Sequence, residues 1–360
     1  MIALNSPIKP DLKKLNEYLE RINSAGWYTN FGPLHNELTA RLEDYLGVQN
    51  LLLISNGTAA LQVAGRALGC ESFVSTPFSF VATASAFLWQ KDQLAFADID
   101  RQSYNLCPYA LEKALKDNAL IDTVAATHVY GNPCDVKAIE QLAHQYDKKV
   151  IYDAAHAFGI EIDGNSVLNY GDASVLSFHA TKVFHTIEGG AVVFKRKQDF
   201  EKAKNMINFG IQPGKGIVEM GTNAKLNEYQ AAVGLVNLDI IDEVLEHRAG
   251  LFAAYRKGLK DSVEMPSWHP EANFNGAYMP IRLENMSQMR QVEKTLAANQ
   301  IQSRHYFSPS LENAFTHCEN FGTEKSRLVA DGVLCLPLHA HMTLKEVQVV
   351  VKSVKDSGVV

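Results

Sequence analysis

Short apolar runs alternate with longer helix-like stretches between about residue 50 and residue 195. The runs are apolar at nearly every position, and helix-like segments such as 108–116 and 136–145 separate them. This pattern predicts a mainly parallel sheet that helices cover on both faces, because the strands of such a sheet are buried on both sides. The predicted strands are residues 51–54, 73–75, 94–97, 123–129, 149–152, 174–178 and 191–194.

The pattern changes after about residue 225. Residues 226–260 predict one or two amphipathic helices, because apolar side chains recur there at helical spacing. Shorter strands at 277–282 and 333–336 and a last helix at 344–354 follow. A chain of 360 residues is long for one hydrophobic core. We therefore expect a large domain over residues 1–240 and a smaller C-terminal α+β domain over residues 241–360.

Polar and small residues follow several of the predicted strands. Residues 55–58 come after the first strand, residues 128–133 come after a later one, and Asp153 and Ser177 close two more. In open α/β sheets, ligands bind beyond the carboxyl ends of the strands. We expect the functional site at that edge of the sheet.

Lys182 and Asp153 carry the chemistry that we expect there. A lysine amine can form a Schiff base with an aldehyde, and a buried carboxylate can keep a pyridine nitrogen protonated. Each residue has a plainer alternative, a solvated surface lysine and an aspartate that caps the next helix. Their order and spacing after two apolar runs favour a site for pyridoxal phosphate (PLP), with Lys182 as the catalytic residue.

The turn at Gly57 and Thr58 and the aromatic residue Phe80 extend this interpretation. Glycine allows a close approach of the backbone to a ligand, and the N-terminus of a helix attracts phosphate. Phe80 can stack on a flat cofactor ring. Taken alone, either feature is explained better by ordinary packing.

Charge and cysteine usage exclude several classes of protein. The net charge is −6 and the isoelectric point is about 6.1, so we expect no nucleic-acid partner. No apolar stretch is long enough to span a bilayer, and the first residues lack the pattern of a secretory signal, so we expect a cytoplasmic protein without a membrane partner. Scattered cysteines without a CxxC pair argue against a disulfide framework and against a metal site. They are Cys70, Cys107, Cys134, Cys318 and Cys335.

Several segments taken in order resemble the DegT/DnrJ/EryC1/StrS aminotransferases, which are PLP enzymes of fold type I that act on nucleotide-linked keto sugars. The resemblance extends from about Gly26 to Leu338 and implies a large domain with a mostly parallel mixed sheet plus a smaller C-terminal domain. The segments that carry it are residues 55–61, 77–83, 96–100, 128–135, 151–159, 177–182 and 188–190.

The resemblance also implies roles for individual residues. Lys182 corresponds to the lysine that forms the Schiff base, and Asp153 corresponds to the partner of the pyridine nitrogen. Asn223 matches an asparagine that reaches the phosphate of the neighbouring subunit, which implies a homodimer with shared active sites. The other implied cofactor contacts are Gly57, Thr58 and Ser177 at the phosphate, Phe80 on one ring face, and Ala155 and His156 on the other face and at the ring hydroxyl.

The substrate side is implied by two further segments. Trp27 and Thr29 belong to a stretch that resembles a lining of the substrate cleft, although Trp27 can also be a packing residue. Arg304 and Tyr306 fall where the family approaches the mouth of the cofactor site. Arg304 could pair with a diphosphate or with the carboxylate of the amino donor. An exposed arginine without a ligand is the alternative.

Two features of the lysine loop bear on the reaction. The family often has a glycine where this chain has Ile187. Dehydratase relatives have histidine where this chain has Lys182, so transamination is favoured, with glutamate as the implied donor. Residues 177–190 resemble members that aminate C4 of a dTDP-linked 4-keto-6-deoxy sugar for O-antigen synthesis. The alternatives are a C3-specific enzyme, a PLP enzyme acting on an amino acid alone, and a non-catalytic PLP-binding sensor.

Overall fold

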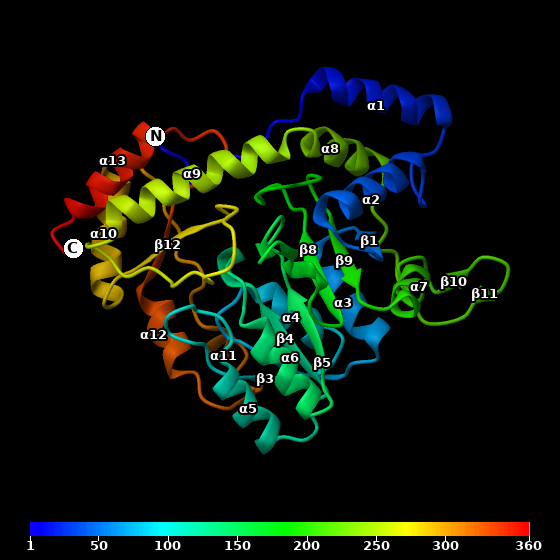
Figure 1. The fold of residues 1–360 in the computed structure, drawn as a ribbon, viewed down its shortest axis with the longest axis horizontal. Helices are drawn as coiled ribbons and strands as arrows, with labels where there is room; N and C mark the ends of the chain where they lie inside the picture. The colour runs from blue at the N-terminus through cyan, green and yellow to red at the C-terminus, as the bar shows by residue number, and fades with distance from the viewer. Residues whose placement is uncertain (360) are drawn as a thin grey trace.

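An eight-stranded mixed sheet forms the centre of the computed structural model, which describes residues 1–359 (Figure 1). The strand order is β1-β9-β8-β5-β4-β2-β3-β13, and β9 is antiparallel to both of its neighbours. The pairs from β8 to β13 are all parallel, so the predicted fold class is confirmed. The strands are β1 (Leu51–Ile54), β2 (Ser72–Ser75), β3 (Gln93–Phe96), β4 (Thr123–Thr127), β5 (Lys149–Asp153), β8 (Ala173–Ser177), β9 (Gly190–Phe194) and β13 (Glu319–Asn320).

Helices cover both faces of this sheet. One face packs against α3 (Gly57–Leu68), α4 (Val81–Leu88) and α7 (Lys197–Met206). Leu51 and Leu53 point to the opposite face, whereas Leu52 and Ile54 point to the first one. This alternation explains why the strands are apolar at every position. The opposite face packs against α2 (Pro33–Leu46), α5 (Pro108–Asp117), α6 (Val136–Gln145) and α8 (Glu228–Leu238).

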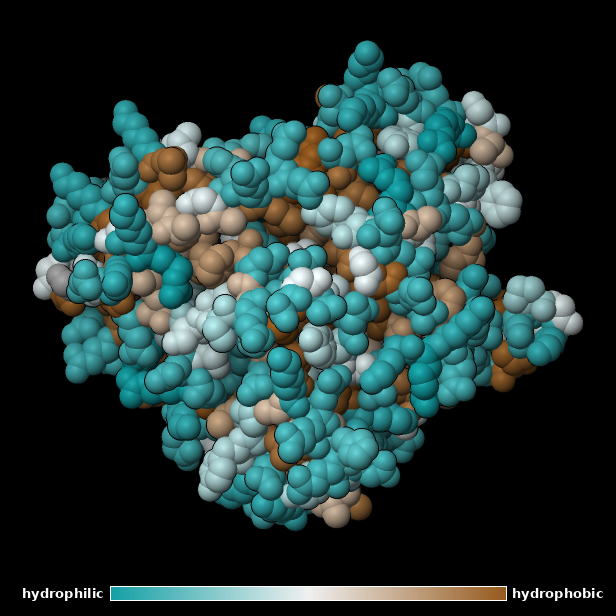
Figure 2. Space-filling view, in the orientation of Figure 1, coloured by the Kyte–Doolittle hydropathy of each residue, from teal (hydrophilic) through white to brown (hydrophobic). Residues whose placement is uncertain are grey.

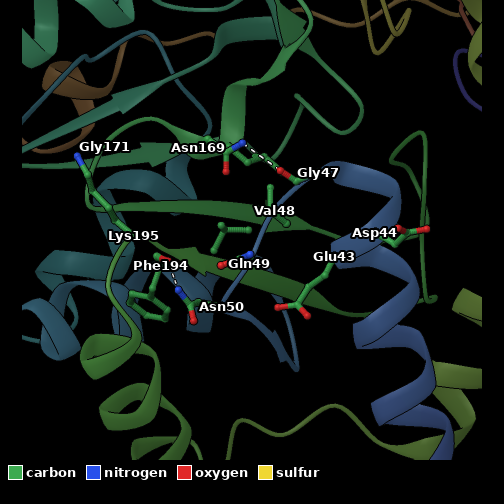
Figure 3. Close-up of a pocket in the computed structure, with 12 residues that line it drawn as sticks. Glu43, Asp44, Gly47, Val48, Gln49, Asn50, Asn169, Gly171, Phe194 and Lys195 are labelled. Atoms are coloured by element: carbon green, nitrogen blue, oxygen red, sulfur yellow. Dashed lines mark hydrogen bonds between the residues drawn. The ribbon is translucent and has the colours of Figure 1, made fainter.

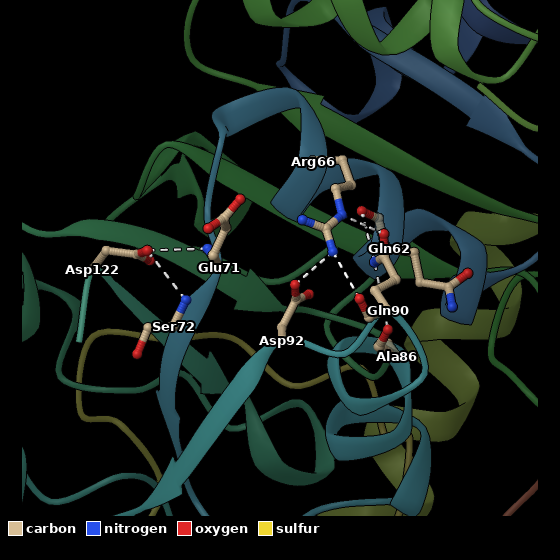
Figure 4. A network of polar contacts seen from close by, with 8 residues as sticks. All are labelled: Gln62, Arg66, Glu71, Ser72, Ala86, Gln90, Asp92 and Asp122. Atoms are coloured by element: carbon tan, nitrogen blue, oxygen red, sulfur yellow. Dashed lines mark hydrogen bonds and ion pairs between the residues drawn. The ribbon is translucent and has the colours of Figure 1, made fainter. Parts of the chain in front are cut away.

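The amino ends of several strands are closed by carboxylates. Asp122 accepts hydrogen bonds from the Glu71 and Ser72 amides at the start of β2, over 3.0 and 3.1 Å (Figure 4). Beside it, Arg66 pairs with Asp92 over 2.6 Å. The bonds to Asp122 satisfy backbone donors that the strand ladder leaves free.

A groove of about 640 Å³ lies on the same amino edge, between the end of α2, the start of β1 and the end of β9 (Figure 3). Several of its polar side chains form hydrogen bonds with neighbouring backbone groups. The Glu43 carboxylate accepts from the Leu51 amide over 3.0 Å, and the Asn169 side chain donates to the Gly47 carbonyl over 3.1 Å.

The second half of the chain builds a separate hydrophobic cluster around the long helix α9 (Ile241–Leu259). Here β12 (Met279–Arg282) pairs antiparallel with β14 (Val333–Leu336), and α10 (Met286–Ala298) and α13 (Leu344–Lys355) pack beside them. The domain boundary at residue 240 stays a prediction.

The first residues of the chain connect the two parts. Ile2 bridges to Ile301 in the second cluster. Asn5 donates to the Thr181 carbonyl over 2.8 Å, and His185 donates to the Ile8 carbonyl over 3.0 Å. Residues 2–8, which we call the N-terminal strap, therefore join the second cluster to the loop that carries the candidate lysine.

The remaining elements lie at the periphery. A hairpin of β10 (Ile211–Gln212) and β11 (Gly216–Ile217) projects away from the body of the molecule (Figure 1). The visible face in Figure 2 is mostly hydrophilic, with apolar side chains in scattered groups. Within residues 1–359, no helix has the length and apolar character needed to cross a membrane. The other elements are α1 (Leu12–Ala25), α11 (Leu311–Ala314), α12 (Glu324–Gly332), β6 (Glu161–Ile162), β7 (Asn165–Ser166), η1 (Val129–Gly131) and η2 (Val167–Asn169).

Candidate active site

A cavity of about 650 Å³ opens at the carboxyl edge of the sheet, where the sequence predicts the site. The ends of β1, β5 and β8 and the loops that follow them form its floor. Residues beyond 275 form part of its wall. The structure brings these predicted residues together in its lining: Gly57, Thr58, Phe80, Asp153, Ala155, His156, Ser177, Lys182, Arg304 and Tyr306.

The turn between β1 and α3 forms a cradle for an anion. The Asn56 side chain caps α3 by accepting from the Ala59 amide over 2.8 Å. The amides of Gly57 and Thr58 precede the first helical hydrogen bond and have no partner within residues 1–359. A Cβ atom at Gly57 would lie 3.0 Å from the Ser177 Cβ atom, so only glycine fits comfortably there. The free amides and the Ser177 hydroxyl group thus face one small space at a helix N-terminus.

Gly190 keeps this turn in place. A Cβ atom at Gly190 would lie 2.9 Å from the Gly57 nitrogen and 2.8 Å from the Leu176 carbonyl oxygen. Because both neighbours are backbone atoms, a larger residue would displace the turn. The antiparallel strand β9 therefore passes directly against the anion cradle.

Asp153 ends β5 as a buried carboxylate. Its Oδ2 atom accepts from Thr83 Oγ1 over 2.6 Å, and its Oδ1 atom accepts from the Ala155 amide over 3.1 Å. Burial raises the pKa of Asp153, and these two hydrogen bonds oppose the shift. No cation lies within ion-pair distance of this carboxylate in the described part of the chain. A cationic ligand would complete its surroundings.

Lys182 follows β8 at the same edge of the sheet. Burial lowers its pKa to about 8, although the charge of Asp153 and the nearby Tyr306 raise it in part. A buried amine near neutral pH then has a usable unprotonated fraction, which nucleophilic attack on an aldehyde requires.

His156 and Phe80 also line the cavity. Burial lowers the pKa of His156 well below its usual range, so the imidazole is neutral. Its Nδ1 atom has no hydrogen-bond partner within residues 1–359, and its ring stacks on Phe307 with centroids 5.9 Å apart. Phe80 is 48% exposed and presents its ring to the cavity.

These groups fit PLP. The anion cradle suits the phosphate, the unpaired Asp153 carboxylate suits a protonated pyridine nitrogen, and the free imidazole nitrogen of His156 can bond to a ring substituent. The amine of Lys182 has the reactivity needed for the aldehyde.

Trp27, Thr29 and Asn223 do not line this cavity. Trp27 donates from its indole nitrogen to the Thr29 carbonyl, in the segment between α1 and α2. The Asn223 side chain accepts from Lys225 Nζ over 2.8 Å. Their predicted roles in substrate and cofactor binding stay predictions.

The sequence interpretation missed several residues that line or support the cavity. Thr83 lies within the quoted segment 77–83, but nothing in the sequence tells a carboxylate partner from an ordinary helical threonine. Tyr278 and Phe307 also line the cavity. Both come from the second half of the chain. Phe307 directly follows Tyr306 in the segment expected at the mouth of the site, whereas no local pattern marks Tyr278.

Comparisons with known proteins agree with this geometry. Residues 11–355 match the DegT/DnrJ/EryC1/StrS aminotransferase family. A protein of Shigella dysenteriae named dTDP-4-amino-4,6-dideoxy-D-glucose transaminase is 39% identical over 99% of this chain and 98% of its own length. A protein of Escherichia coli with the same name is 34% identical, over 95% of this chain and 94% of its own length. The crystal structure of DesI in the presence of its TDP-sugar product superposes with a TM-score of 0.92. It is 30% identical, covering 98% of this chain and 92% of that one.

Proposed function

Because the chain belongs to the DegT/DnrJ/EryC1/StrS aminotransferase family, we propose that it moves an amino group from glutamate to C4 of a nucleotide-linked 4-keto-6-deoxy sugar. The enzyme is a PLP-dependent aminotransferase that acts on sugar nucleotides. The nucleotide is most simply dTDP, since the Shigella and Escherichia relatives carry that nucleotide in their names.

One observation supports the proposal above all others. A lysine of lowered pKa and a buried carboxylate without a cationic partner line the same cavity, beside an anion cradle. A catalytically silent binding protein does not need a lysine of lowered pKa, so this pair favours an enzyme over a sensor.

The chain's own residues have separate tasks in the reaction. PLP, when bound, supplies an electron-withdrawing ring that stabilises negative charge on the carbon that loses a proton. Lys182 Nζ would take a proton from the α-carbon of the donor and deliver it to the cofactor carbon that carried the aldehyde, as a general acid–base. Asp153 would keep a proton on the ring nitrogen, and the amides of Gly57 and Thr58 with Ser177 would hold the phosphate. Phe80 and Ala155 would confine the ring, and His156 would bond to the ring hydroxyl group.

Arg304 and Tyr306 form the entrance of the cavity. The Arg304 guanidinium lies 4.4 Å from the centroid of the Tyr306 ring, and it forms no ion pair with a carboxylate of residues 1–359. A guanidinium in this place suits a diphosphate or the donor carboxylate. We assign Trp27 and Thr29 to the sugar-nucleotide side of the site.

Exposed apolar side chains support a homodimer in which Asn223 reaches the partner's phosphate. Ile187, 56% exposed, has a φ of +72°, an unfavourable backbone angle for a β-branched residue. Its neighbour Glu188 accepts a hydrogen bond from Gln230 at the start of α8. Large exposed apolar side chains often mark an interface. We assign these further exposed apolar side chains to it: Trp27, Tyr28, Phe209, Ile211, Ile217, Val218, Met220 and Tyr229.

The place of action follows from the substrate class. Nucleotide-linked sugars are made in the cytoplasm, so we place the enzyme there, in the synthesis of O-antigen or related surface sugars. The buried or half-buried free thiols suit a reducing compartment.

The direct test uses the cofactor-loaded chain and glutamate, followed by a candidate keto sugar. We expect glutamate to change the visible absorbance of the cofactor, and dTDP-4-keto-6-deoxyglucose to restore it with an amine appearing at C4 in the NMR spectrum. Restoration only by a 3-keto sugar would support the C3-specific alternative. No change with glutamate would favour the sensor.

A further inference from the structure

Tyr278 makes the one hydrogen bond to the Lys182 side chain within residues 1–359. Lys182 Nζ donates to Tyr278 Oη over 3.4 Å, and the same nitrogen lies 5.8 Å from the centroid of the tyrosine ring. The reactive amine therefore contacts both the hydroxyl group and the ring of one residue.

Tyr278 comes from a distant part of the chain, just before β12 in the second half. Its ring packs against His156 with centroids 4.7 Å apart, and against Tyr130 and Tyr306 at 5.6 Å each. Aromatic contacts on three sides leave the ring little freedom, so the position of the hydroxyl group is well defined.

The backbone before Tyr278 is also held firmly. Arg248 on α9 donates to the Gly276 carbonyl over 3.1 and 2.9 Å, and Asn275 donates to the His156 carbonyl over 2.8 Å. Arg248 is buried and has no carboxylate partner within the described residues. A buried guanidinium that donates only to backbone carbonyls costs stability, because its charge is removed from water without an opposite charge nearby. Its place indicates that this segment needs an exact position.

The hydroxyl group of Tyr278 suits an amine that gains and loses protons. Burial raises the pKa of Tyr278, so the hydroxyl group keeps its proton through the working range of pH. It can accept a hydrogen bond from the ammonium form of Lys182 and donate one to the neutral amine.

We propose that Tyr278 is a positioning residue for Lys182, and that its hydroxyl group holds the amine where protons are taken up and returned. The proposal rests on the aminotransferase function proposed above and adds a residue from the second half of the chain to that site. The residue acts through Lys182 and leaves the reaction itself to the lysine.

Tyr278→Phe isolates the hydroxyl group, because the ring and its neighbours stay. The other titratable groups that face Lys182 or Tyr278 are unchanged by the substitution. They are Tyr130, Asp153, His156, Arg248, Arg304, Tyr306 and Cys335.

The chain offers a matched control. Tyr255 on α9 is fully buried, and its hydroxyl group has no partner within residues 1–359. Tyr255→Phe therefore removes the same atom from a buried tyrosine that does not line the cavity.

The experiment compares the wild-type chain with both variants, as full-length protein. Without cofactor, Lys182 is labelled with trinitrobenzenesulfonate at a series of pH values and measured by peptide mass spectrometry. We expect half-maximal labelling of the wild type near pH 8, in line with the lowered pKa of Lys182. Tyr278→Phe should shift this midpoint to lower pH, because the hydrogen bond that the charged ammonium form loses is stronger than the one that the neutral amine loses. Reloaded with PLP, it should also lose about tenfold in kcat with glutamate.

Each outcome decides the matter. A lower midpoint with a lower kcat in Tyr278→Phe, and neither change in Tyr255→Phe, supports the proposal. An unchanged midpoint overturns it, even where kcat falls, since loss of packing alone would lower the rate. Labelling uses neither glutamate nor sugar, so an error in the proposed substrate would leave this result intact.

Discussion

The two edges of the central sheet carry cavities of nearly the same size but of opposite character. The amino-edge groove measures about 640 Å³ and the carboxyl-edge cavity about 650 Å³. In the groove, Glu43 satisfies the Leu51 amide, and Asn169 satisfies the Gly47 carbonyl (the second bond is drawn in Figure 3). In the cavity, Asp153 lacks a cation, and Lys182 is buried with a lowered pKa.

This difference shows that cavity volume alone does not identify an active site. Polar groups that are fully bonded within the protein contribute to stability, whereas buried groups that lack partners cost stability and remain available to a ligand. We therefore call the amino edge of the sheet the structural edge and its carboxyl edge the chemical edge. Substitutions at the two edges should have opposite effects on activity and stability.

The largest effect should come from Lys182→Ala. Loss of the general acid–base and of the covalent anchor should lower product formation at least about a thousandfold. The assay is amine formation from glutamate and the keto sugar. Lys195→Ala, at the rim of the groove, is the matched control and should keep a rate within about twofold of the wild type. Ordinary turnover in Lys182→Ala would contradict the assignment.

Asp153→Asn should lower kcat about a hundredfold, because a neutral amide no longer favours the protonated ring nitrogen. Cofactor affinity, measured by equilibrium dialysis, should fall as well. Asp122→Asn keeps an acceptor oxygen at the structural edge and should leave both quantities unchanged. Equal losses in the two variants would show that the edges do not differ in this way.

Asp153→Asn should stabilise the cofactor-free chain near pH 7, although it lowers kcat. Burial raises the pKa of Asp153, so the folded chain binds this proton more tightly than the unfolded chain, and its stability falls as pH rises through the raised pKa. Asp153→Asn removes this loss. Its melting temperature should exceed that of the wild type near pH 7, and the advantage should disappear below the ordinary pKa of aspartate. A variant that melts lower near pH 7 would contradict this reasoning.

Thr83→Val should have a smaller effect than Asp153→Asn. The carboxylate loses a short hydrogen bond but keeps the bond from the Ala155 amide, so we expect kcat to fall about tenfold. Thr295→Val on the exposed side of α10 is a control with the same change of atoms. A Thr83→Val rate equal to that of the control would mean that the hydroxyl group does not orient Asp153.

Asn169→Ala should change least. It removes one hydrogen bond to the Gly47 carbonyl in the groove, so we expect a loss of about 0.5–1 kcal/mol in the free energy of unfolding by urea. Activity should stay that of the wild type. A clear loss of activity would show that the groove takes part in the reaction.

Much of the scaffold could be predicted because its signals are local. Apolar runs bounded by polar turns placed β1 and β14 at their observed residues, and helical spacing did the same for α6. The two-residue strand β13 was not predicted, because so short a segment has no hydrophobic periodicity. The antiparallel direction of β9 depends on pairing that no single run encodes.

The site was predictable where its residues follow strands, and not where they come from elsewhere. Lys182 and Asp153 stood out as polar residues after apolar runs. Thr83 and Tyr278 matter only through contacts across 70 and 96 residues, and contacts at such separation leave no trace in a single sequence. The place of Asn223 outside the cavity leaves its role tied to the proposed partner subunit.

The N-terminal strap has a practical consequence for handling the protein. Asn5 bonds to the carbonyl of the residue that directly precedes Lys182, while Ile2 is anchored beside Ile301. A purification tag or a deletion at the N-terminus would disturb the loop that carries Lys182, although the two are far apart in the sequence. Weak activity of such a preparation should first be traced to that manipulation, by comparing it with protein whose leading residues are untouched.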